Sequence, residues 1–455
     1  GEILFYGIGV TADPQEGMRL WGSAANDGSA EASFELALAF LRDEEIPRDP
    51  DSAARYARRA AEAGLPRAEG LLGSLYAEGV GVDRSLETAI EWYRRAASHG
   101  DATAQEILGE HFSTGKGVAR DIPAAIGLFR QAISGGNRKA RFRLGLLLRA
   151  ESNSSQSKEE GNRLIREAAE AGEPGAQYDL AQQCLSESPS PNYSEAVGWL
   201  KKAAERGVVL AQVELALLLR EGLGAAKDDV EATKLLVRAE RAGSRDAAFY
   251  LAYADVFDEG KADVARRAAL ERLRTLGLEG SHEAQLTVGL VLWQGLFGEP
   301  DRVAAVEWFR RAAEGEYSLA QAALGEAYEE GSGVAQNYAL ALEWYRRAAR
   351  SGEAKAFENL GSVFERGMGV RVDPVLAYAW YSLGAAKGRP LAEASRDRVA
   401  RGMTSDQVSE AQVLSARVQG DPWMEHAIPR EEVRKDSAAA TRAEPSRRAR
   451  QEDSP

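Results

Sequence analysis

A pair of residues, Leu or Val followed by Gly or Ala, recurs along this 455-residue chain at intervals of 35 to 37 residues. These anchor pairs are Leu36-Ala37, Leu72-Gly73, Leu108-Gly109, Leu144-Gly145, Leu180-Ala181, Leu215-Ala216, Leu251-Ala252, Val288-Gly289, Leu324-Gly325 and Leu360-Gly361. Unrelated helices would not keep this register, and a fixed period of this length indicates a solenoid in which each repeat packs on its neighbours. The period therefore overrides the expectation of about three globular domains that length alone suggests.

Each period contains two amphipathic segments, which predicts a helix pair. The first segment carries the anchor, whose small residue allows neighbouring helices to approach closely. The second carries an Ala-Ala pair and, at 91–97 and 343–349, the sequence EWYRRAA. We expect its tryptophans to be core residues between stacked repeats: Trp92, Trp199, Trp308, Trp344 and Trp380. The predicted fold is all-α, a right-handed α/α superhelix of about eleven 36-residue helix-pair repeats with a C-terminal helical cap.

Glycine-rich turns separate the two helices of a repeat at 79–82, 115–118, 331–334 and 367–370. Glycine tolerates the positive φ angles that end a helix. We expect the second helix to begin after a capping residue, at Asp83, Asp121 or Asp373, with Pro374 in the first helical position. These turns are not phosphate loops, because they follow a helix and no Gly-Lys-Ser or Gly-Lys-Thr comes after them.

The motif Leu-Gly-x-x-Tyr, then Gly-x-Gly-Val, then Trp-Tyr-Arg-Arg-Ala-Ala in 72–100 and 324–352 resembles the Sel-one-like repeat (SLR), a relative of the tetratricopeptide repeat. The resemblance extends from residue 1 to about residue 418, and it is weakest around residues 145, 181 and 252. It implies a non-enzymatic adaptor that holds protein partners together, as such proteins do in bacterial envelope and signalling systems and in the endoplasmic reticulum. The disulfide-stapled bacterial subgroup is not matched, because Cys184 is the only cysteine.

The repeats also define the expected domain organisation. Residues 1–389 form the solenoid, whose first repeat is truncated, because Gly7-Ile8-Gly9-Val10 aligns on residues 79–82. We expect residues 390–418 to form capping helices whose outer face meets water. Residues 419–455 are expected to be a linker and a disordered polar tail, because they contain few large apolar side chains. Any signal peptide, anchor or domain upstream of Gly1 would lie outside this sequence.

The first helices of the repeats are expected to line a concave groove. Aligning the anchors on a tetratricopeptide helix assigns the lining positions, which are polar or small in the outer repeats and apolar in the middle ones. We predict that partner-binding residues are Phe142, Leu146, Tyr178, Leu217, Phe249, Tyr253, Leu290 and Trp293. Such an apolar stripe would receive an amphipathic helix or an extended peptide. The equally open alternative is that tighter curvature buries these side chains against neighbouring helices.

Two other functions remain open from the sequence. Aromatic side chains in the groove would also suit a carbohydrate or cell-wall ligand, such as peptidoglycan or an exopolysaccharide. Flat exposed platforms would favour glycan binding over peptide binding, and the residues that decide this are Tyr178, Phe249, Tyr253 and Trp293. The solenoid would alternatively be a structural spacer within a complex.

Charge and composition exclude several classes of function. The formal net charge of -13 and the pI near 5.2 argue against nucleic-acid partners, which need a basic face. No apolar run reaches the roughly 20 residues of a membrane span, so we expect no direct membrane insertion. Cys184 is expected to be a buried structural thiol, and the four histidines, His99, His111, His282 and His426, lack zinc-site spacing.

We therefore expect no catalytic residue, metal or cofactor, and a protein partner whose identity the sequence does not give. Abundant Ala and Arg and the family resemblance favour an exported, periplasmic bacterial protein, with a cytoplasmic one as the alternative.

Overall fold

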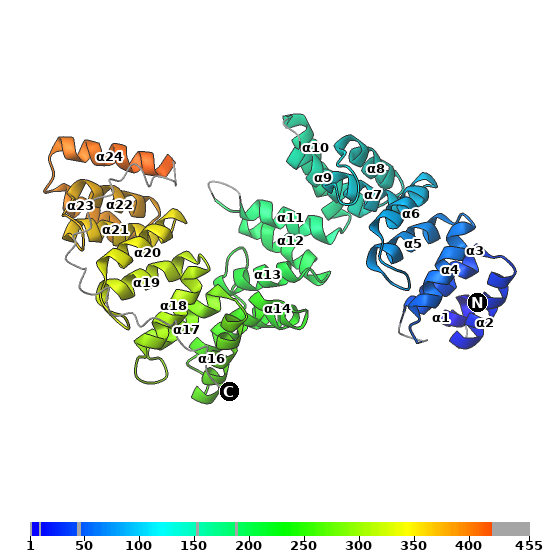
Figure 1. Cartoon of the computed structure of the whole chain (residues 1–455), viewed down its shortest axis with the longest axis horizontal. Coiled ribbons are helices and arrows are strands. Elements are labelled where there is room, and N and C mark those ends of the chain that lie inside the picture. The colour runs from blue at the N-terminus through cyan, green and yellow to red at the C-terminus, as the bar shows by residue number, and fades with distance from the viewer. Residues whose placement is uncertain (1, 9–10, 43–46, 152–153, 187–189, 421–455) are drawn as a thin grey trace, which may run out of the picture. The chain divides into compact units, whose positions relative to one another are not determined.

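The computed structural model describes residues 2–8, 11–42, 47–151, 154–186 and 190–420. The chain divides into two compact units, Gly1–Ala242 and Gly243–Pro455, and each is described by itself. Every regular element in the described residues is a helix (Figure 1). In the part of the chain that the structure describes, eleven helix pairs, from α1/α2 to α21/α22, precede two further helices, which confirms the all-α helix-pair fold.

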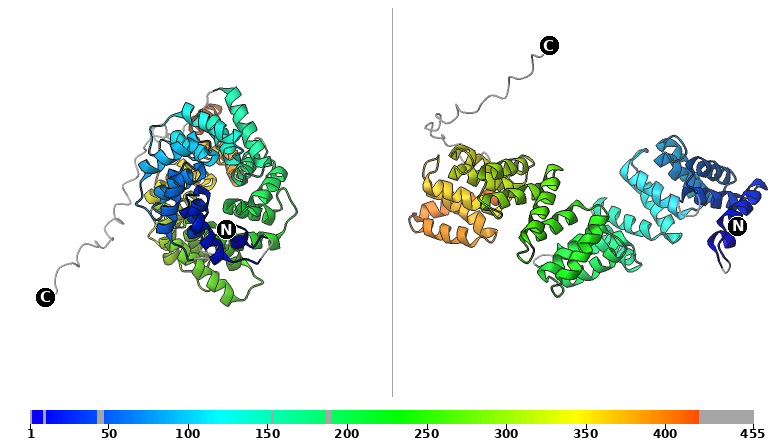
Figure 2. Two further views of the ribbon diagram at one scale, coloured as in Figure 1. Left: turned by 90° about the vertical axis from the view of Figure 1, so that its right-hand side faces the viewer. Right: turned by 90° about the horizontal axis from the view of Figure 1, so that it is seen from below.

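Unit 1 contains the first seven pairs, in which each helix packs on the next one in the chain (Figure 2). Its helices are α1 (Glu2–Tyr6), α2 (Pro14–Asn26), α3 (Ala30–Leu41), α4 (Pro50–Glu62), α5 (Pro66–Glu78), α6 (Leu86–Ser98), α7 (Ala102–Thr114), α8 (Ile122–Ser134), α9 (Arg138–Glu151), α10 (Ser155–Glu170), α11 (Pro174–Leu185), α12 (Tyr193–Glu205), α13 (Val209–Glu221) and α14 (Asp229–Arg241).

Unit 2 contains four pairs and the two closing helices. They are α15 (Arg245–Phe257), α16 (Asp263–Leu278), α17 (His282–Gln294), α18 (Arg302–Glu314), α19 (Ser318–Glu330), α20 (Tyr338–Arg350), α21 (Ala354–Arg366), α22 (Pro374–Ala386), α23 (Pro390–Ala400) and α24 (Ser405–Gly420). Odd-numbered helices carry the anchors and are called A helices below; even-numbered helices up to α22 are called B helices.

In five repeats the glycine of the anchor lies under a ring of the B helix in the same repeat, whereas Gly145 lies against the side chain of Ile165. A Cβ atom on Gly325 would lie 2.5 Å from Tyr345, and one on Gly361 would lie 2.5 Å from Tyr381. The same arrangement joins Gly73 to Tyr93, Gly109 to Phe129 and Gly289 to Phe309. The anchor glycine is therefore required for a close helix–ring contact inside each of these five repeats, and these rings are buried.

The position of the buried ring corrects the prediction for the tryptophans. Tyr345 is fully buried, whereas the preceding Trp344 is half-buried and lies under the Arg347 guanidinium, 4.6 Å from the ring centroid. Trp92 and Trp308 are covered in the same way by an arginine three residues later. These three tryptophans border the core, and the aromatic residue after each fills it; Trp199 and Trp380 are buried as expected.

The glycine turns hold neighbouring repeats together. Gly79 ends α5 at a φ of 75°, and a Cβ on Gly81 would meet the Pro50 carbonyl oxygen of the preceding repeat at 1.9 Å. Gly224 and Gly333 approach the preceding B helix as closely. Only glycine fits where two backbones meet at this distance.

The caps of the B helices agree with the prediction at two sites. Asp121 and Asp373 accept hydrogen bonds from the backbone N–H groups of Ala124 and Leu376, both at 2.9 Å. At α6, however, Ser85 is the cap in place of Asp83, because its hydroxyl reaches the N–H of Thr88.

Helices α23 and α24 pack on the last repeat. Ala392 and Ala411 are buried, and Val399 and Leu414 pack on the core that α20 to α22 form. Leu391 and Val413 of the same helices are exposed. The tail expected from residue 421 onwards lies outside the described residues, as does His426.

Candidate interaction surfaces

Polar side chains link successive A helices in unit 1. Glu106 of α7 is buried and forms ion pairs with Lys139, at 3.5 Å, and with Arg143 of α9. Arg149 of α9 makes two hydrogen bonds to the Asp179 carboxylate of α11, at 2.8 and 2.6 Å. A buried carboxylate needs such partners, because leaving it uncompensated is costly. The polar positions predicted to face the groove therefore also join one repeat to the next.

Two of the four predicted groove residues of unit 1 make contacts between repeats. The Phe142 ring packs over Gly175 of α11, where a Cβ would lie 2.8 Å from it. The Tyr178 hydroxyl donates a hydrogen bond of 2.6 Å to Glu214 of α13. Burial, followed by this carboxylate, raises the pKa of Tyr178. Leu146 and Leu217 are half-buried.

In unit 2, aromatic residues follow one face of α15. The ring centroids of Phe249 and Tyr253 are 5.9 Å apart, and those of Tyr253 and Phe257 are 4.8 Å apart. Tyr253 keeps 44% of its surface exposed and Phe257 keeps 37%. Leu290 of α17, which lies beside α15, is also 37% exposed. Phe249, Tyr253, Phe257, Leu290 and Trp293 are called the α15–α17 stripe below.

Trp293 occupies the edge of this stripe nearest α19. Its ring packs on the core of α18 and α19 and lies 5.7 Å from Phe309. The Arg302 guanidinium lies 4.8 Å from the Trp293 centroid, over the ring. Since Arg302 occupies this side of the ring, Trp293 is not a free stacking platform for a sugar.

Carboxylates border the stripe at the first turns of the A helices. Burial, and then the charges of Asp246 and Glu283, raise the pKa of Tyr250 on α15. Burial and Glu283 also raise the pKa of Tyr317, at the start of α19. Within the described ranges, neither Asp246 nor Glu283 forms an ion pair with a basic side chain. Negative potential therefore reaches these tyrosines from one end of the A helices.

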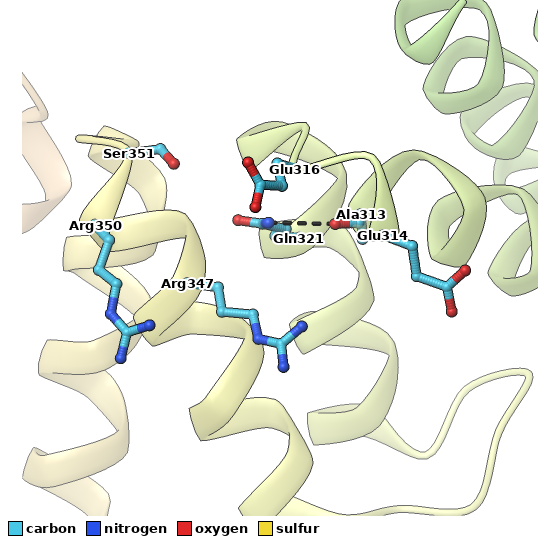
Figure 3. Close-up of a pocket in the computed structure, with 7 residues that line it drawn as sticks. All are labelled: Ala313, Glu314, Glu316, Gln321, Arg347, Arg350 and Ser351. Atoms are coloured by element: carbon cyan, nitrogen blue, oxygen red, sulfur yellow. Dashed lines mark hydrogen bonds between the residues drawn. The ribbon is translucent and has the colours of Figure 1, made fainter. Parts of the chain in front are cut away.

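A buried glutamine joins repeats at a different place, in the fourth residue of several A helices. Gln321 donates from Nε2 to the Ala313 carbonyl oxygen at 3.2 Å, beside a hollow that Glu316, Arg347 and Arg350 also line (Figure 3). The same bond to a residue eight positions earlier occurs at Gln105, Gln177, Gln212 and Gln285. Because it recurs, we interpret this hydrogen bond as a structural contact that satisfies a carbonyl group at the end of the preceding B helix.

In one repeat, a glutamate with charged partners stands in place of this glutamine. Glu69 stands at the glutamine position, is fully buried, hydrogen-bonds to His99 Nδ1 at 2.8 Å and forms an ion pair with Arg95 at 3.3 Å. These two residues come from the end of α6 in the same repeat. The hollow near Gln321 thus belongs to a repeating contact of the fold, and Arg347 within it is already bonded to Glu343 at 2.6 Å.

Phe257 belongs to the stripe but is not among the predicted groove residues. Its position lies one residue beyond the lining position assigned from the tetratricopeptide helix. The spacing Phe249, Tyr253, Phe257 would have placed all three on one helix face, since residues four apart are neighbours on a helix. Cys184 is buried, as expected.

In the described residues, no group of three or more His, Cys, Asp or Glu side chains could hold a metal ion. None of the helices described combines the length and the apolar character of a membrane span.

The sequence matches the Sel1 repeat family at nine places: residues 1–29, 30–65, 66–101, 102–137, 174–208, 209–244, 282–317, 318–353 and 356–388. The unmatched stretches 138–173 and 245–281 hold the anchors at 145 and 252, where the glycine turn is missing. No curated protein matches the sequence.

Solved structures similar to this chain include a protective antigen of uropathogenic Escherichia coli with an SLR fold. It is 26% identical, with a TM-score of 0.67, over 100% of this chain and 95% of that one. A Sel1 repeat protein from Oxalobacter formigenes is 27% identical over 84% of this chain and 90% of its own, with a TM-score of 0.30. An immunity protein from Pseudomonas aeruginosa is 22% identical over 48% of this chain and 83% of its own, with a TM-score of 0.38.

Repeats of this family build non-catalytic scaffolds for protein–protein interaction. The matched segments cover well over half of the residues and share the anchors, turns and helix pairs described above. The chain therefore belongs to the Sel1 repeat family.

Proposed function

We propose that this protein is a non-enzymatic adaptor that binds a segment of a partner protein on the α15–α17 stripe, in a bacterial envelope or signalling assembly. The observation that carries the proposal is the exposure of Tyr253, Phe257 and Leu290 on two A helices that contact each other. Clustered exposed apolar side chains of this kind mark interaction sites. The scaffold role of the family supports the proposal.

Binding of a glycan is less well supported than binding of a protein segment. Arg302 covers Trp293, and the Tyr178 hydroxyl is bonded to Glu214, so neither residue is a flat open platform. In the α15–α17 stripe the rings of Phe249 and Tyr253 are tilted by 46° to each other, which suits interdigitating side chains better than a planar sugar.

A capture experiment tests the adaptor role. The intact chain, immobilised, is exposed separately to periplasmic and cytoplasmic extracts of the source cells, and captured proteins are identified by mass spectrometry. The test variant is Tyr253→Ser, Phe257→Ser, Leu290→Ser. The matched control, Val264→Ser, Leu278→Ser, Val303→Ser, removes three side chains of the same unit that are even more exposed, at 80%, 71% and 66%.

We expect one protein to be captured from the periplasmic extract by the intact chain and by the control, and to be lost from the test variant. Equal capture by all three would contradict the stripe as the binding site. Capture from the cytoplasmic extract alone would contradict the exported location while leaving the adaptor role intact.

A further inference from the structure

The charges around the α15–α17 stripe specify the kind of segment it binds. Asp246 and Glu283 lie in the first turns of α15 and α17, the same helices that carry the stripe. Acidic residues in a first turn interact favourably with the helix dipole, which accounts for part of their presence. Asp246 lies three residues before Phe249 on α15, and Glu283 lies seven residues before Leu290 on α17, so each carboxylate shares a helix face with a residue of the stripe.

A second group of carboxylates borders the stripe on α19. Burial, together with the neighbouring charges of Glu326 and Glu330, raises the pKa of Glu329, although the Tyr345 hydroxyl and Arg366 oppose this shift. Glu326 is paired with Lys355 at 2.7 Å, and Glu330 lies 3.9 Å from Arg302. These basic side chains compensate the α19 group in part, whereas Asp246 and Glu283 form no ion pair within the described residues.

Apolar side chains that share their helix faces with carboxylates lacking an ion pair in the described residues are complementary to one type of ligand. Resting on the proposed adaptor function, we infer that the partner segment is an amphipathic helix whose apolar face packs on the α15–α17 stripe and whose edge facing Asp246 and Glu283 carries Lys or Arg. Apolar anchors supply most of the affinity in such a complex, and charges at the edge set orientation and selectivity.

Two synthetic 20-residue peptides test this inference against the full chain. Both carry Leu and Phe at helical spacing along one face. One has four lysines along the adjoining edge, and the other has glutamines there. Binding is measured by fluorescence anisotropy at low and at physiological salt.

Three variants accompany the intact chain. Asp246→Asn, Glu283→Gln removes the two edge charges with little change in shape. Glu307→Gln, Glu343→Gln removes the same number of charges from exposed positions on the B helices α18 and α20. Tyr253→Ser, Phe257→Ser, Leu290→Ser removes the apolar contacts, and circular dichroism checks that each variant is folded.

We expect the lysine peptide to bind the intact chain about tenfold more tightly than the glutamine peptide, with the difference shrinking as salt rises. The Asp246, Glu283 variant should lose roughly fivefold in affinity for the lysine peptide and nothing for the glutamine peptide. The Glu307, Glu343 variant should behave like the intact chain, and the stripe variant should bind neither peptide.

Three results would overturn the inference. Equal binding of the two peptides to the intact chain, lost in the stripe variant, would refute the role of charge and leave the docking site standing. An equal loss in the Glu307, Glu343 variant would show that net charge alone attracts the lysine peptide. Binding that survives in the stripe variant, or no binding of either peptide, would contradict the proposed function as well.

Discussion

At the scale of single residues, the size of the small anchor residue is related to the size of the side chain about twenty positions later in the same repeat. Gly73, Gly109 and Gly325 are matched by rings at Tyr93, Phe129 and Tyr345, whereas Gly145 is matched by the branched side chain of Ile165. Where the anchor is alanine, an aliphatic residue takes the place of the ring, as with Ala216 and Leu236. The volume removed from the A helix is thus filled by the B helix, as close packing requires.

This complementarity predicts the effect of Gly325→Ala. The new methyl group would lie 2.5 Å from Tyr345, so we expect a loss of about 2 kcal/mol in stability despite the better helix propensity of alanine. Adding Tyr345→Leu should recover most of this loss. Gly198→Ala, in a helix with open space around it, is the matched control and should raise stability by about 1 kcal/mol.

Thermal unfolding followed by circular dichroism measures these three effects. If Gly325→Ala stabilised the protein as much as Gly198→Ala does, the close helix–ring contact would not exist in solution.

The sequence predicted that the anchor residue has to be small. It did not show which of two adjacent aromatic residues in the B helix fills the core. Trp344 and Tyr345 are both large and lie about 100° apart on the helix, so either could face the core. The cation–π contact with Arg347 keeps Trp344 at the border. Asp83 was likewise a plausible cap by residue type, and the backbone path of the turn selects Ser85.

At the scale of helices, glutamates at the same position of two A helices lie in different electrostatic environments. Glu329 of α19 and Glu365 of α21 are 36 residues apart, and each accepts a tyrosine hydroxyl, from Tyr345 at 2.8 Å and from Tyr381 at 2.7 Å. Burial raises the pKa of Glu329, with further contributions from neighbouring carboxylates. At Glu365 burial acts in the same direction, but the bonds from Arg398 and Tyr381 outweigh it and lower the pKa.

Opposite pKa shifts predict opposite dependences of stability on pH. Because the pKa of Glu329 is higher in the folded protein than in the unfolded one, ionisation of Glu329 destabilises the folded state. The destabilisation is complete at pH values above the folded-state pKa and absent at pH values below the unfolded-state pKa, near 4.3. Glu329→Gln should therefore raise the melting temperature at pH 7, with an advantage that vanishes as the pH falls to about 4.

Glu365→Gln serves as the control of opposite sign. An ionised Glu365 contributes stability above its unfolded pKa, and this contribution disappears as the pH falls through the lower folded value. The substitution should lower the melting temperature at pH 7 and matter less in acid. Melting curves of both variants between pH 3 and 8 provide the test, and shifts of the same sign would refute the assigned environments.

The helix register also determined how much of the candidate site could be predicted. Aligning the repeat anchors on a tetratricopeptide helix identified the face of α15 and α17 on which Tyr253 and Leu290 are exposed. It could not show that the Tyr178 hydroxyl bonds to Glu214, because that contact depends on the distance between neighbouring repeats. The assignment of these residues to partner binding stays a prediction.

At the scale of the whole molecule, the repeats divide into regular and degenerate ones. Stretches 138–173 and 245–281 fall outside the family matches, and α15, which carries three residues of the α15–α17 stripe, lies in the second of them. Repeats packed on neighbours contribute stability together, so a single repeat can diverge from the pattern while the array stays folded.

The central claim is that a partner protein contacts the α15–α17 stripe, and site-specific photo-crosslinking in the source cells tests it most directly. A photoreactive phenylalanine analogue replaces Tyr253 in one version of the protein and Val264, which is 80% exposed on α16, in another. We predict a crosslink to one partner protein from position 253 and none from position 264. Crosslinks to the same protein from position 264 alone, or from neither position, would contradict the claim.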